Sequence, residues 1–67
     1  MNLDHGLVAT ATEKLRLVDR ETQHDARNLI TRYVGLSELA GGDAEARARL
    51  PKAERQMRDF VVTGRVG

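Results

Sequence analysis

The chain has 67 residues, no cysteine, two aromatic side chains and a formal net charge of +1. A chain of this length buries only about 60% of its unfolded surface, so we expect residues 1–67 to form one domain with a marginal core. The lack of cysteine excludes disulfides and thiolate zinc sites, and the small net charge does not by itself indicate a nucleic-acid or membrane partner.

No segment suggests a membrane or export signal. The longest apolar run is far shorter than the roughly 18 residues of a membrane-spanning helix. The first residues also lack the positive region and the apolar region of a secretory signal. We therefore expect no membrane partner and a cytoplasmic location, or a place in a phage virion.

A long apolar stripe at helical spacing predicts a first helix over about residues 7–34 that starts near Asp4 or Thr10. Its members are Leu7, Ala11, Leu15, Val18, Thr22, Ala26, Leu29, Tyr33 and Leu36. The steps of three and four residues repeat an 11-residue rhythm, which favours straight or slightly right-handed packing. The capping-box spacing of Thr22 and Asp25 leaves open a break near Asp19–Thr22. The unbroken phase of the stripe favours a continuous helix.

Glycines mark the end of this helix and the turn that follows. Gly35 can end the helix in a left-handed conformation. The pair Gly41–Gly42 is the clearest breaker in the chain and predicts a turn. Asp43 is then expected to cap a second helix over about residues 43–63.

The second helix carries its own apolar stripe, with a proline inside it. The stripe consists of Ala46, Leu50, Ala53, Met57 and Phe60. Pro51 removes a backbone donor, so we expect a kink or a very tight junction there. Gly64 is expected to end the helix before a short tail at residues 64–67.

These elements predict an all-α fold in which a long amphipathic helix and a shorter kinked helix form an antiparallel hairpin. An isolated hairpin buries only one seam, so we expect oligomerisation or docking to a partner to complete the core. The stripe residues expected in the core or in an oligomer interface are Leu7, Leu15, Val18, Leu29, Tyr33, Leu36, Leu50, Met57 and Phe60.

A basic cluster on the second helix is the strongest candidate for a binding surface. Its predicted contact residues are Arg47, Lys52, Arg55 and Arg58, on the face opposite the apolar stripe. Such a face can contact an acidic protein or phosphates. The simpler alternative is a solvated face whose pairs, Glu45–Arg49 among them, are ordinary i,i+4 ion pairs.

Two other patterns give weaker candidates. Gly35–Leu36–Ser37 has the order of a helix-turn-helix turn, but Gly41–Gly42 leaves no room for a recognition helix after it. The set Glu21, His24 and Asp25 contains a Glu-x-x-His spacing like that of di-iron bundles. A continuous first helix would place His24 nearly opposite the apolar stripe, so we expect His24 to be exposed and to bind no metal.

No pattern supports catalysis or a cofactor, because the chain has no cysteine and Ser37 does not lie in a Gly-x-Ser-x-Gly elbow. We therefore predict a non-catalytic helical assembly protein, either a homo-oligomer or a small subunit of a bacterial or phage complex, with a protein as its partner. The first alternative is a small, antitoxin-like DNA-binding regulator, which would make nucleic acid the partner. The weaker alternative is a metal-binding helical bundle.

Overall fold

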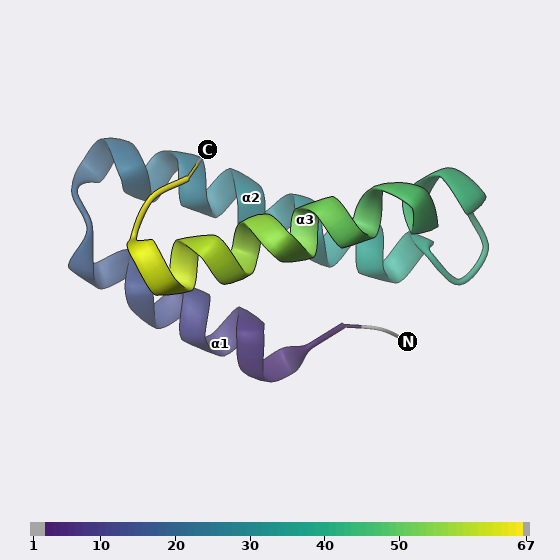
Figure 1. The fold of residues 1–67 in the computed structure, drawn as a ribbon, viewed down its shortest axis with the longest axis horizontal. Helices are drawn as coiled ribbons and strands as arrows, with labels where there is room; N and C mark the ends of the chain where they lie inside the picture. Colours follow the sequence, from purple (N-terminus) through teal and green to yellow (C-terminus); the bar gives the residue numbers. More distant parts are fainter. Residues whose placement is uncertain (1–2, 67) are drawn as a thin grey trace.

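The computed structural model describes residues 3–66 as an all-helical chain. Three α-helices follow one another: α1 (His5–Lys14), α2 (Arg20–Leu39) and α3 (Ala44–Thr63), with a 3₁₀ turn, η1 (Leu15–Leu17), after α1. Figure 1 shows α2 and α3 side by side, with α1 along one half of α3. No strand occurs among residues 3–66. The expected all-α class is confirmed, but the structure has three helices in place of the two predicted.

The prediction of one continuous helix over residues 7–34 is wrong, because the chain is extended at two residues after η1. Val18 has φ −117° and ψ 165°, and Asp19 has φ −71° and ψ 170°. The Asp19 carboxylate accepts a hydrogen bond from the Thr22 backbone N–H at 2.8 Å and so caps α2. The break lies where the alternative reading of the sequence placed it, with Asp19 rather than Thr22 as the cap.

The Gln23 side chain supplies hydrogen bonds to two backbone carbonyls at the break. The Gln23 side-chain amide donates to the Leu15 carbonyl at 2.7 Å and to the Val18 carbonyl at 3.4 Å. Asp4 caps the start of α1 by accepting from the Leu7 N–H at 3.0 Å. The two Gln23 contacts offset part of the helical hydrogen bonding lost at the break, which is worth about 0.5–1.5 kcal/mol net per bond.

The break lets α1 fold back onto the other two helices and bury its own apolar face. Leu7 is 8% exposed and Ala11 is fully buried, and both belong to the same core cluster as residues of α2 and α3. Full burial of a leucine contributes about 1.5–3 kcal/mol. Tertiary burial of this size outweighs the small preference for extending the helix.

The expected helix end at Gly35 is also wrong, since α2 continues to Leu39. The left-handed glycine is Gly64, with φ 74°, and it ends α3. The break that the sequence places at Gly41–Gly42 is present, and the Asp43 carboxylate caps α3 by accepting two backbone N–H groups. The helix runs through Pro51 without interruption.

The core is small and lies where the three helices meet. Its buried members are Leu7, Ala11, Ala26, Leu29, Tyr33, Ala40, Leu50, Ala53, Met57 and Phe60. Three further members of the predicted stripe, Leu15, Val18 and Leu36, are partly buried against it. The Tyr33 hydroxyl accepts a hydrogen bond from the Asp4 backbone N–H at 3.2 Å, which ties the start of α1 to the middle of α2. Within residues 3–66 no helix has both the length and the apolar character needed to cross a bilayer.

Candidate functional site

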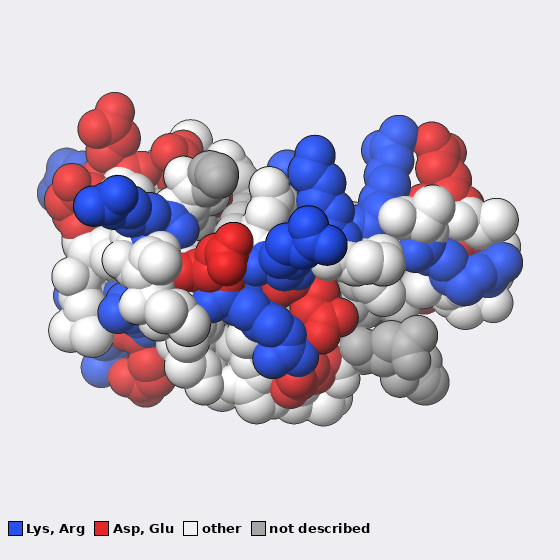
Figure 2. Space-filling view, viewed as in Figure 1, with Lys and Arg blue, Asp and Glu red and all other residues white. Residues whose placement is uncertain are grey.

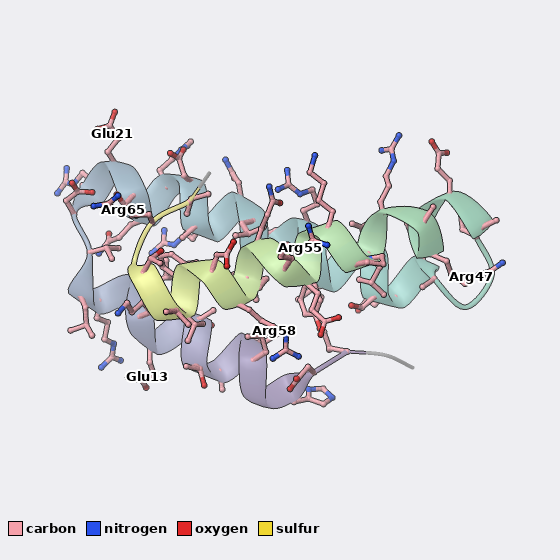
Figure 3. The ribbon with its side chains drawn as sticks, viewed as in Figure 1. Glu13, Glu21, Arg47, Arg55, Arg58 and Arg65 are labelled. Carbon is pink, nitrogen blue, oxygen red and sulfur yellow. The ribbon has the colours of Figure 1, made fainter. Side chains whose placement is uncertain are left out.

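The four basic residues predicted to form one face of α3 differ in what lies next to them. Figure 3 shows Arg47 near the start of the helix, Arg55 projecting from its middle and Arg58 on the side toward α1. Lys52 lies on the opposite flank, where α3 meets α2. The cations expected on one face of α3 therefore have different neighbours, because Arg58 stands toward α1 and Lys52 stands toward α2.

Two of these cations are held by the chain itself. The Arg47 guanidinium donates to the Ala40 carbonyl at 2.8 Å and thereby satisfies a backbone acceptor at the end of α2. Arg58 pairs with Glu54 at 2.7 Å and lies 3.6 Å from the Asp4 carboxylate. The hydrogen bond to Glu54 raises the pKa of Arg58 above its ordinary value. Arg47 and Arg58 are therefore already engaged in contacts within the chain.

Lys52 lies in a groove of about 440 Å³ between α2 and α3. The groove is lined by Arg32, Leu36, Ala48, Arg49, Lys52, Ala53 and Gln56. The small and aliphatic side chains form an apolar surface within it, and cations from both helices stand around that surface. None of the described lining residues is acidic.

Arg32 is the cation from outside α3 that sequence reasoning missed. It lies on the flank of α2, and its guanidinium donates to the Gln56 side-chain oxygen at 3.0 Å, which joins the two helices across the groove. The helical projection of α3 cannot include a residue of another helix. The available signal was the position of Arg32 four residues before Leu36, on the edge of the first stripe.

The charges around the groove are only partly compensated. Arg49 pairs with Glu45 at 2.8 Å in the i,i+4 arrangement expected from the sequence. Neither Arg32 nor Lys52 forms an ion pair with a carboxylate of residues 3–66. Figure 2 shows Lys and Arg side chains gathered over the middle of α3 and beyond its edge, with acidic side chains among them. The groove is thus a local concentration of positive charge on a nearly neutral protein.

A second hollow continues along α3 toward the C-terminal end and has a different character. It is lined by Gln56, Asp59, Thr63, Arg65 and Val66. Gln56 borders both hollows, so they are neighbours on one side of α3. Because Asp59 and Arg65 carry opposite charges, this part offers no preference for an anion.

The other sequence candidates do not assemble into sites. The side chains of His24 and Asp25 are 78% and 60% exposed, and His24 Nδ1 lies 3.7 Å from an Asp25 oxygen. Within residues 3–66 no three His, Asp or Glu side chains are grouped closely enough to hold a metal ion. Gly35–Leu36–Ser37 lies inside α2, so it is not the turn of a helix-turn-helix.

Comparisons with known proteins found no matching family model, no matching curated protein and no matching solved structure. The candidate site therefore stands on its residues and geometry alone.

Proposed function

We propose that this chain is a non-catalytic helical interaction protein that binds an acidic protein through the groove between α2 and α3. One observation carries the proposal. Arg32 and Lys52 line the groove from two different helices without a carboxylate partner among residues 3–66, while Arg49 beside them is paired with Glu45. An acidic partner would supply the carboxylates that these two cations lack, because interfaces place complementary charges against one another.

Two features favour protein over nucleic acid as the partner. Both aromatic side chains, Tyr33 and Phe60, are fully buried, so neither can stack on a base. The groove surface formed by Leu36 and Ala48 offers apolar area that a phosphate backbone would not use. A net charge of +1 also gives little of the long-range attraction on which non-specific nucleic-acid binding depends.

A second copy of the chain is a poorer partner for this groove than a different, acidic protein. In a two-fold symmetric dimer the same patch meets itself, so the groove of one copy would face the cations of the other. We therefore propose a heterologous assembly in which the chain is a small subunit. Oligomerisation through another face would be a separate association.

The test is retention of a protein partner in the native cell. A tagged chain would be purified in parallel as wild type, as Arg32→Glu/Lys52→Glu and as Arg16→Glu/Arg27→Glu. The third form is the matched control, because it makes the same change in charge at exposed residues outside the groove lining. We expect wild type and control to retain the same protein in stoichiometric amount and the groove variant to lose it.

Two results would count against this function. The first is that wild type retains no protein in stoichiometric amount, or that the groove variant retains it as well as the control does. The second is binding to duplex DNA with a steep salt dependence that the groove variant abolishes. Three engaged cations would give a log–log slope of roughly −3, at about −0.9 per neutralised phosphate. That outcome would make DNA binding the function.

A further inference from the structure

The groove lies on the side of the α2–α3 pair that faces away from α1. Arg58 stands on the flank of α3 toward α1, 3.6 Å from Asp4, whereas Lys52 lines the groove on the opposite flank. No described residue of α1 lines the groove, so on this side α2 and α3 form a two-helix layer.

The groove has the form that receives another helix. Side chains on a helix form ridges that pack into the groove between two neighbouring helices, and a four-helix arrangement buries more surface than two or three helices alone. Leu36 from α2 and Ala48 from α3 are the accessible apolar residues over which such a ridge would lie. Leu36 is only partly buried by the chain itself, so it has apolar surface left to cover.

The cations define the charge that the incoming helix must carry. Arg32 stands on the α2 side, and Lys52 and Arg49 stand on the α3 side. A helix lying between these cations would turn its apolar stripe toward the groove and one flank toward each of the two helices. Carboxylates on both flanks would meet a cation on each side. The Gln56 oxygen holds the Arg32 guanidinium at 3.0 Å, so this cation is already oriented before a partner arrives.

We propose that the groove binds an acidic amphipathic helix, with an apolar stripe over Leu36 and Ala48 and Glu or Asp on both flanks. This inference rests on the proposed function and names the form of its partner. The binding mode is that of a helix laid into a groove, in which the apolar stripe supplies affinity and the flanking charges supply orientation.

The probe is a designed, fluorescein-labelled peptide of about 15 residues, which is near the shortest length that forms a helix on its own in water. It carries leucine and alanine along one stripe and glutamate on both flanks. Two matched peptides have glutamine or lysine in place of every glutamate. Fluorescence anisotropy would measure the affinity of each peptide for the full chain at low and moderate salt.

We expect the glutamate peptide to bind, the glutamine peptide to bind more weakly and the lysine peptide not to bind. Arg32→Glu/Lys52→Glu should weaken the glutamate peptide by roughly tenfold or more, because two attractions become repulsions. It should also gain binding to the lysine peptide. Arg16→Glu/Arg27→Glu should change neither affinity. Circular dichroism would show that all three protein forms keep the same helicity.

The inference is overturned if the glutamate peptide does not bind, or if the groove and control variants weaken it equally. These failures can be separated from failure of the proposed function. A protein partner that is still retained in cells and lost in the groove variant would keep the interaction role while excluding the helical ligand. A partner absent from wild type would remove the interaction role whatever the peptide does.

Discussion

The break after η1 makes a direct prediction about where a proline can be tolerated. Arg20 is the first residue of α2, at which a backbone N–H has no helical carbonyl to which it can donate. The residue before it, Asp19, has φ −71° and ψ 170°, the extended conformation that a following proline favours. Arg20→Pro should therefore leave the free energy of unfolding within about 0.5 kcal/mol of wild type, or raise it by up to about 1 kcal/mol.

Arg27 provides the matched comparison, because it is an exposed arginine inside the same helix. A proline there removes a helical hydrogen bond and its ring clashes with the preceding turn, at a cost of about 3 kcal/mol or more. For a domain of this size, 1 kcal/mol shifts the melting temperature by about 4–8 °C. The two variants should therefore differ by roughly 12 °C or more.

Thermal unfolding followed by circular dichroism would measure both variants, with urea titrations as the second measurement. If helix formation were continuous through Val18 and Asp19, both prolines would lie in a helix interior and would cost similar amounts. Equal losses of about 3 kcal/mol in Arg20→Pro and Arg27→Pro would refute the break and restore the single long helix.

Four further predictions concern stability. Gly35→Ala should raise the free energy of unfolding by about 0.5–1 kcal/mol, because Gly35 is inside α2 and a Cβ there would meet nothing within 4 Å. Gly64→Ala should lower the free energy of unfolding by about 1 kcal/mol, because Gly64 has φ 74°. Urea titrations would measure both variants, and a destabilising Gly35→Ala would contradict the continuous α2. Leu29→Ala should cost about 2–5 kcal/mol in the same assay, since Leu29 is 1% exposed, and a cost below 1 kcal/mol would place it outside the core. The hydrogen bonds with Thr22 lower the pKa of Asp19 below 3.8, so its stabilising contribution is present above that pH and is lost as the pH falls through the lower, folded-state value. Asp19→Ala should be less stable than wild type at neutral pH and approach it in acid, and an unchanged difference between the two would rule out this ionisation as the cause.

Much of the helix punctuation could be read from the sequence, because it depends on local chemistry. Asp43 caps α3, Gly41–Gly42 lies in the turn and Gly64 ends the last helix, and each of these follows from the properties of that residue type. Gly35 misled the prediction because a glycine is also tolerated inside a helix at a cost of about 1 kcal/mol. The choice between the two roles was made by the packing of α2 against α3, which is not local.

The break near Asp19 could be foreseen only as an alternative, because the apolar stripe keeps its helical phase through it. Leu15, Val18 and Ala26 all face the core, whether the chain between them is helical or extended. The deciding contribution is the burial of Leu7 and Ala11 against distant residues of α3. Hydrophobic periodicity predicts which side chains are buried, but it does not predict that the chain turns back on itself to bury them.

The binding surface shows the same division between local and distant causes. A helical projection of α3 treats Arg47, Lys52 and Arg58 as equivalent cations on one face. In the fold they have different partners, because Arg47 donates to the Ala40 carbonyl and Arg58 pairs with Glu54 and Asp4. The cations that a partner could contact are those that form no ion pair within the described part of the chain. On the α2 side of α3 these are Lys52 and, from α2 itself, Arg32. Charge counted along one helix therefore predicts that a basic surface exists, whereas the position of the surface follows only from the contacts between helices.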